Sequence, residues 1–112
     1  METLIKNYRI NSAKWMGLNY DIIPRYKTHK IEVKIGNEWT EWLPDQDHNQ
    51  MAIMIGKLQK ENILTSLFFE DEGECWVRLN ELDDDNFGDI LDSDIRIAFM
   101  KAWNEYYESL NQ

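Results

Sequence analysis

The chain has 112 residues, 43% of them hydrophobic, and a net charge of −9 at pH 7. Its length favours a single globular domain over residues 1–112, and its five Trp, five Tyr and four Phe exclude a disordered chain. The single cysteine, Cys75, excludes an internal disulfide, and the apolar run at 51–56 is too short to span a bilayer. No charged-then-apolar leader opens the sequence, so we expect a soluble, cytoplasmic protein.

Hydrophobic spacing and turn residues predict three helices and two hairpins. Gly17 is expected to end the first helix, and Asp45 or Asp47 to cap the second. In chain order we expect a helix over 2–16, a short strand at 20–23, a hairpin from 30–36 and 38–43, a helix to about 61, a hairpin from 63–69 and 75–79, and a helix over 93–111.

The strand expected at 63–69 has apolar residues on both faces, which predicts a central position in a sheet covered on both sides. Residues 81–92 are interpreted as a polar connection, followed by a helix capped by Asp92 or Ser93. The element order therefore predicts an α+β fold: an antiparallel-rich sheet of four or five strands packed between or against three helices.

Charge is distributed very unevenly along the chain. Residues 1–35 hold seven Lys or Arg against three acidic residues, and residues 36–112 carry a net charge of −13. One acidic tract accounts for most of the excess, and Arg78 is its only cation. The eleven carboxylates of this tract are Glu70, Asp71, Glu72, Glu74, Glu81, Asp83, Asp84, Asp85, Asp89, Asp92 and Asp94.

The acidic tract suggests calcium binding only weakly. An EF-hand loop placed on residues 83–94 puts Asp83 and Asp85 at ligand positions one and three, and Gly88 at the required glycine position. Phe87 then stands at position five, where it cannot bind an ion, and Asp94 replaces the usual bidentate Glu. A solvated acidic loop is the favoured interpretation, with Asp94 serving the start of the last helix.

The same carboxylates fit a second hypothesis, in which they imitate the regular negative charge of DNA and occupy a basic groove of another protein. Direct binding of nucleic acid is disfavoured by the sequence pI of about 4.6. A purely solubilising acidic surface is the simpler alternative.

Catalytic and cofactor motifs are not evident. The two histidines are His29, in a loop, and His48, beside two carboxylates at a helix start, where a surface position is favoured over a zinc site. Cys75 lies within a strand, which favours a buried apolar role over a reactive thiolate. We therefore expect a non-enzymatic protein without a cofactor.

Aromatic residues exceed what the predicted core requires. Trp39 and Trp42 are expected on opposite faces, which leaves one of them exposed. Trp103 and Tyr107 add aromatic surface near the C-terminal end, where they indicate either core packing or an interface, including a homodimer.

Four stretches, in order, resemble the phage ABA sandwich domain, a family of small phage and prophage proteins. They are 4–18, especially 12–17 (SAKWMG), 44–58 (PDQDHNQM through GKL), 75–77 (CWV) and 95–107 (IRIA through WNEYY). The resemblance implies a sheet between helical layers and an accessory protein acting in the cytoplasm of a host bacterium. It implies no activity and no catalytic residues.

The leading hypothesis is a phage or prophage accessory protein that binds another protein. Its sharper form is an inhibitor of a host nucleic-acid enzyme, such as an anti-CRISPR protein, that presents an acidic DNA-mimic surface to a basic partner. The alternatives are a structural or virion-associated module and a calcium binder using Asp83, Asp85 and Asp94. The candidate partner-binding residues are Glu81, Asp83, Asp84, Asp85, Asp89, Trp103 and Tyr107.

Overall fold

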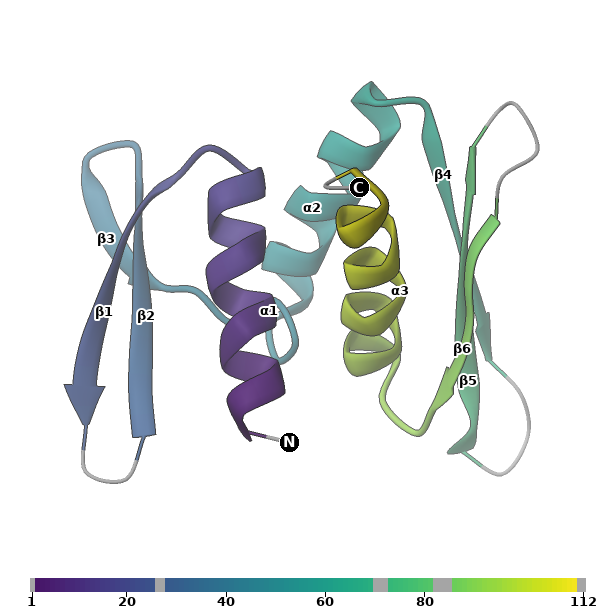
Figure 1. Cartoon of the computed structure of the whole chain (residues 1–112), viewed down its shortest axis with the longest axis horizontal. Helices are drawn as coiled ribbons and strands as arrows, with labels where there is room; N and C mark the ends of the chain where they lie inside the picture. The colour runs from purple at the N-terminus through teal and green to yellow at the C-terminus, as the bar shows by residue number, and fades with distance from the viewer. Residues whose placement is uncertain (1, 26–27, 70–72, 82–85, 111–112) are drawn as a thin grey trace. The chain divides into compact units, whose positions relative to one another are not determined.

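The computed structural model describes residues 2–25, 28–69, 73–81 and 86–110, with side chains except at 2, 3, 81 and 86–91 (Figure 1). The predicted α+β class is confirmed, but the strands form two antiparallel sheets of three, ordered β1-β2-β3 and β4-β5-β6. The elements are α1 (Glu2–Trp15), β1 (Asn19–Arg25), β2 (Thr28–Ile35), β3 (Glu38–Glu41), α2 (His48–Lys60), β4 (Ile63–Phe69), β5 (Cys75–Glu81), β6 (Asn86–Asp92) and α3 (Ile95–Leu110).

The chain divides into two compact units, Met1–Pro44 and Asp45–Gln112, which are described separately. That the whole chain forms one domain remains a prediction from its length. None of the helices in the described part of the chain is both long enough and apolar enough to cross a membrane.

In the first unit, α1 packs on β1 and β2. The buried side of α1 includes Ser12, which interrupts an otherwise apolar stripe. The Ser12 hydroxyl donates to the Arg9 carbonyl at 3.0 Å and accepts from Nε1 of the fully buried Trp42 at 2.8 Å. Because this hydrogen bond satisfies a buried indole, the polar residue has a structural role at the centre of the unit.

The C-terminal end of α1 is a Schellman motif. Gly17 has a φ of +72°, a left-handed conformation that favours glycine. The N–H of Gly17 donates to Lys14 O and that of Leu18 to Ala13 O, both at 3.0 Å. The predicted helix stop at Gly17 is therefore confirmed.

The first sheet shows the alternation expected from its sequence. Ile31 and Val33 of β2 are buried, whereas Lys34, between Val33 and Ile35, is exposed. The prediction that one of Trp39 and Trp42 is exposed is also confirmed. Trp39 is 51% exposed, whereas Trp42 is fully buried. Exposed Ile35 marks the limit of the buried stripe.

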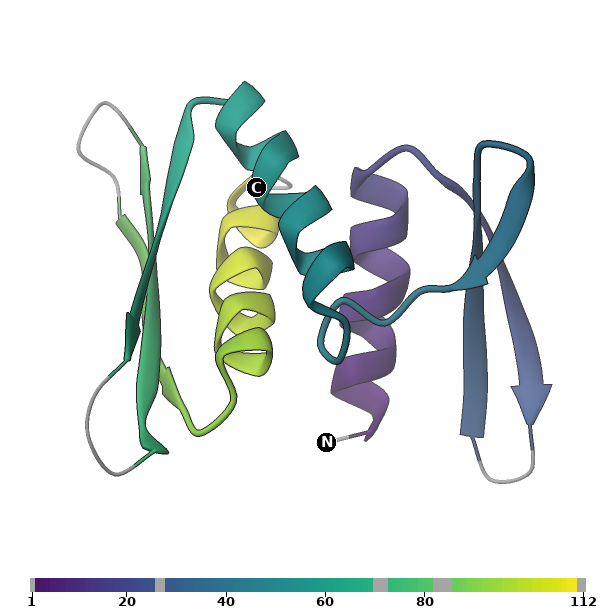
Figure 2. The ribbon, with the colours of Figure 1, turned by 180° about the vertical axis from the view of Figure 1, so that it is seen from behind.

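In the second unit, α2 and α3 lie on one face of the β4-β5-β6 sheet (Figure 1, Figure 2). α3 contacts β5 and β6, and α2 contacts β4. The inward-facing residues of β5 are Cys75, Val77 and Leu79, all buried. They meet a helical layer that includes the fully buried Phe99 and Met54.

Two predictions about the second sheet are wrong. β4 is not central and covered on both sides; it is an edge strand beside β5, with Leu64 and Phe69 exposed by 52% and 71%. Residues 81–92 are not a polar connection, because Asn86–Asp92 forms β6. Pairing with β5 places Asn86 opposite Asn80 and Phe87 opposite Leu79, so the ladder overrides the low strand propensity of Asp, Asn and Gly.

Candidate functional site

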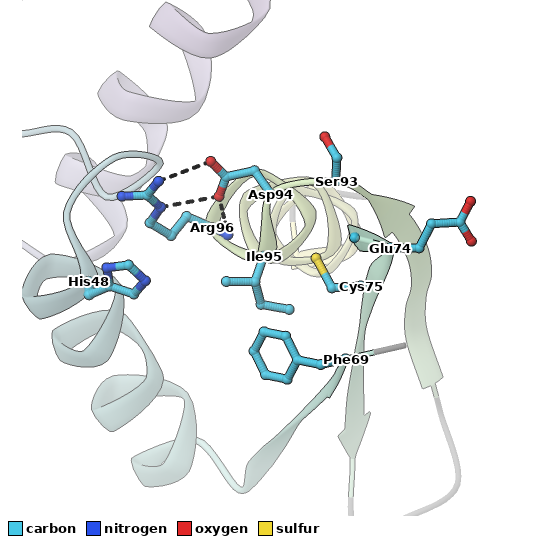
Figure 3. Close-up of a pocket in the computed structure, with 9 residues that line it drawn as sticks. His48, Phe69, Glu74, Cys75, Ser93, Asp94, Ile95 and Arg96 are labelled. Carbon is cyan, nitrogen blue, oxygen red and sulfur yellow. Dashed lines mark hydrogen bonds and ion pairs between the residues drawn. The ribbon is translucent and has the colours of Figure 1, made fainter. Parts of the chain in front are cut away.

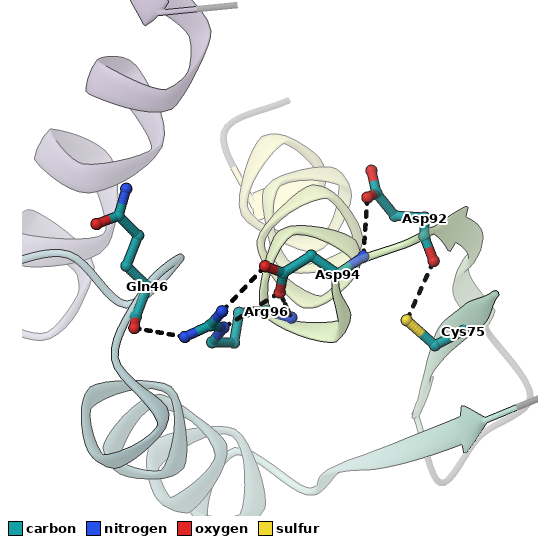
Figure 4. Close-up of polar contacts among 5 residues, drawn as sticks. All are labelled: Gln46, Cys75, Asp92, Asp94 and Arg96. Carbon is teal, nitrogen blue, oxygen red and sulfur yellow. Dashed lines mark hydrogen bonds and ion pairs between the residues drawn. The ribbon is translucent and has the colours of Figure 1, made fainter. Parts of the chain in front are cut away.

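The two aspartates at the end of the acidic tract are both engaged within the second unit (Figure 4). Asp94 serves the start of α3 as expected. It is also the cap of this helix, in place of Asp92 or Ser93, because its Oδ1 accepts the backbone N–H of Arg96 at 2.9 Å. Its carboxylate also accepts from Arg96 Nε at 3.1 Å and Nη2 at 3.0 Å. Arg96 Nη1 donates to the Gln46 carbonyl at 2.6 Å, which ties the start of α3 to the segment before α2.

Asp92 is paired in a similar way. Its Oδ2 accepts from Lys101 Nζ at 2.9 Å and its Oδ1 from the backbone N–H of Asp94 at 3.1 Å. Burial alone would raise the pKa of Asp92, but the hydrogen bonds from Lys101 and Asp94 and the charge of Lys101 lower it. The pKa of Asp94 is lowered mainly by its hydrogen bond to Arg96. Both carboxylates therefore have cationic partners inside the chain.

A hollow of about 330 Å³ lies where the N-terminal end of α3 meets the ends of β4 and β5 (Figure 3). The interactions drawn among its lining residues are those between Asp94 and Arg96. Cys75 donates its thiol to the Asp92 carbonyl at 3.1 Å. The lining residues are His48, Phe69, Gly73, Glu74, Cys75, Ser93, Asp94, Ile95 and Arg96.

The hollow is chemically unsuited to nucleophilic catalysis by its cysteine. Burial, followed by the charges of Asp92 and Asp94, raises the pKa of the Cys75 thiol, so the protonated form is favoured. The guanidinium of Arg96 already donates to Asp94 and Gln46. The arrangement offers a small surface depression with mixed polar and apolar walls.

A distinct cluster lies on the opposite face of the same sheet, away from α2 and α3. Phe68 and Trp76 stand opposite each other and stack, with ring centroids 3.9 Å apart and planes 12° from parallel. The Arg78 guanidinium lies 5.2 Å from the Trp76 ring centroid, a cation–π distance. Leu64, on the same face, is 52% exposed. We call Leu64, Phe68, Trp76 and Arg78 the outer-face cluster.

The outer-face cluster was missed by the sequence interpretation because it depends on strand register. Phe68 and Trp76 come together only through the antiparallel pairing of β4 with β5. Apolar residues on both faces of 63–69 predict burial on both sides, but a strand with an exposed aromatic face has the same sequence pattern.

The predicted partner-binding residues are placed very differently from one another. Trp103 is fully buried and stacks on the half-buried Tyr107 at 5.0 Å, so its ring belongs to the core and not to an exposed surface. Glu81 ends β5, and the register shift between β5 and β6 leaves Asp89 without a directly opposite residue. Asp83, Asp84 and Asp85 lie outside the described residues.

The calcium hypothesis receives no support from the part of the chain that is described. β6 is an antiparallel strand through residue 88, where an EF-hand loop would need a sharp turn. The remaining candidate in view, Asp94, binds Arg96 through both carboxylate oxygens. Among the described residues, no group of three or more His, Cys, Asp or Glu side chains is placed to hold a metal ion.

Comparisons with protein-family models, with curated proteins and with solved structures found no match to this chain.

Proposed function

We propose that this chain is a non-enzymatic binding protein and that the outer-face cluster contacts its protein partner. The observation that carries the proposal is the stacked Phe68–Trp76 pair with Arg78 beside it, on the sheet face opposite the helices. Trp, Arg and other aromatic residues are the side chains most enriched where protein interfaces concentrate their binding energy.

The composition of the cluster indicates the chemistry of the partner surface. Leu64 and Phe68 offer apolar surface, because 52% and 38% of these residues, respectively, are exposed to solvent. Arg78, the only cation of the acidic tract, lies on the central strand β5 opposite Ser66, beside this area, and its guanidinium suits a carboxylate or a carbonyl oxygen. A partner with an apolar patch and an acceptor next to it fits best.

Two variants test the proposal by capture from a lysate of cells that express the chain. Trp76→Thr removes the central ring but keeps a β-branched residue suited to a strand, and Arg78→Glu reverses the charge beside it. A protein retained by the wild type should be lost with both variants, and the purified pair should show at least tenfold weaker binding.

Trp39→Thr is the matched control, because Trp39 is also a strand tryptophan and is 51% exposed, but lies in the first sheet. Its capture profile should equal that of the wild type. Equal retention by Trp76→Thr, Arg78→Glu and wild type would contradict a role for the outer-face cluster.

The narrower sequence-based hypothesis, an accessory protein of a phage or prophage that inhibits a host nucleic-acid enzyme, remains a separate prediction. Its inhibitory part is supported by the charge of the acidic tract, and its phage origin by the resemblance in sequence. Asp83, Asp84 and Asp85 are the carboxylates of this tract that we choose for the test. Replacing all three with Asn should weaken an inhibitory complex and flatten its salt dependence. If DNA does not compete with the chain for a captured enzyme, the hypothesis of DNA mimicry is wrong. The alternative of a structural or virion-associated module is then favoured.

A further inference from the structure

β4 has an open edge. Among the residues that the structure describes, it pairs only with β5, in the order β4-β5-β6, over the seven residues from Ile63 to Phe69. The other side of such a strand presents main-chain N–H and C=O groups that can pair with another strand. Four of its side chains are large, apolar and exposed by 36–71%: Leu64, Leu67, Phe68 and Phe69.

The other three sheet edges carry features that discourage such pairing, and β4 has none of them. β1 contains Asp21, Pro24 and Arg25. β3 has only four residues, two of which are Glu. β6 contains two Asp residues and a register shift against β5. β4, with the sequence ILTSLFF, has no charge, no proline, no glycine and an unbroken register.

We propose that β4 pairs antiparallel with β4 of a second copy of this chain, so that two β4-β5-β6 sheets form one continuous six-stranded sheet. A second copy is favoured over another partner because β4 is complementary to itself when two copies are paired about the centre of the strand. Two copies with a net charge of −9 each repel one another over most of their surfaces, whereas the uncharged β4 brings no like charges together.

The residues of β4 also suit a two-fold axis. The register that pairs all seven residues centres the axis on Ser66, which then faces Ser66 of the second copy. Leu64 faces Phe68 and Ile63 faces Phe69, so large apolar side chains meet apolar side chains. The pairing brings the exposed apolar side chains of β4 beside those of the second copy. It shares Leu64 and Phe68 with the outer-face cluster, so its tests measure self-association and not the capture of another protein.

Sedimentation equilibrium of the purified wild-type chain provides the first test. The mass should rise from 13.5 kDa towards twice that value as the concentration increases through the micromolar range. A mass that stays at 13.5 kDa throughout the micromolar range of concentrations would overturn the proposal.

Charges at residue 66 test the two-fold register. Ser66→Lys and Ser66→Glu should each raise the dissociation constant about fivefold or more, because identical charges face each other across the axis. An equimolar mixture of the two variants should restore association, since Lys then faces Glu. Failure of the mixture to associate more tightly than either variant would exclude the proposed register.

Ser66→Cys gives a readout that does not depend on charge. Directly opposite residues in an antiparallel pair have Cα atoms about 4.5–5.5 Å apart, within the range for a disulfide. Mild oxidation should give a covalent dimer, while the native Cys75 stays reduced because it is buried. The control, Trp39→Cys, places an exposed thiol on the first sheet and should cross-link far more slowly. Equal rates for the two variants would contradict the inference.

Discussion

Asp94 both caps α3 and pairs with Arg96, and a single substitution can separate these two roles. Asn is as good an N-cap as Asp but carries no charge. Asp94→Asn should therefore lower the free energy of unfolding at pH 6 by about 0.5–1 kcal/mol, the scale of a partly exposed ion pair. Asp94→Ala, which also removes the cap acceptor, should cost about 1 kcal/mol more. Urea unfolding of the three proteins measures both differences.

The lowered pKa of Asp94 gives the pH dependence a definite sign. The ion pair contributes fully above the pKa of the unfolded carboxyl, about 3.9, and its contribution is lost as the pH falls through the lower pKa of the folded state. The difference between wild type and Asp94→Asn should therefore shrink between pH 5 and pH 2. A difference that is unchanged over this range would show that the charge of Asp94 does not stabilise the fold.

The hydrogen bond between Ser12 and Trp42 should contribute strongly to the free energy of unfolding because it is buried. Ser12→Ala leaves the buried indole N–H of Trp42 without this acceptor, which should cost about 1–3 kcal/mol. In a Trp42→Phe background the same Ser12→Ala change should cost much less, because the donor is gone. Equal costs in the two backgrounds, measured by thermal unfolding, would show that the bond is not energetically coupled.

At the scale of the elements, local signals in the sequence determined most of the helices. Asp47 caps α2 as expected, with Oδ1 accepting the N–H groups of Asn49 and Gln50 at 2.8 and 3.1 Å. β6 was missed because its identity depends on pairing with β5 rather than on its own residues. The edge position of β4, and therefore the outer-face cluster, was missed for the same reason: strand order is not a local property.

Two glycines offer a matched pair with opposite expected effects. Gly17→Ala should destabilise the chain by about 1 kcal/mol, because the φ of +72° strains any residue with a Cβ. Gly56→Ala, inside α2, should stabilise it by up to about 1 kcal/mol, since a Cβ there meets open space and alanine favours the helix. Melting temperatures that move in the same direction would contradict this assignment.

For the whole molecule, net charge and apolar surface oppose each other. The charge of −9 disfavours association of two copies, and β4 favours it. Salt should therefore strengthen the dimer: raising the ionic strength from about 0.01 M to about 0.15 M shortens the screening length from about 30 to about 8 Å. The dissociation constant should fall over this interval, whereas a rise would mean that attractive ion pairs hold the copies together.

The central claim is that the open sheet of the second unit is an interaction surface. Hydrogen exchange at the β4 backbone tests this claim most directly. Amides of Ile63–Phe69 that do not pair with β5 should become protected as the concentration of the wild-type chain rises. Protection of β1 should stay constant, and with Ser66→Lys the change in β4 should require a concentration about fivefold higher or more. Amides of β4 that exchange at the same rate at every concentration would contradict the account.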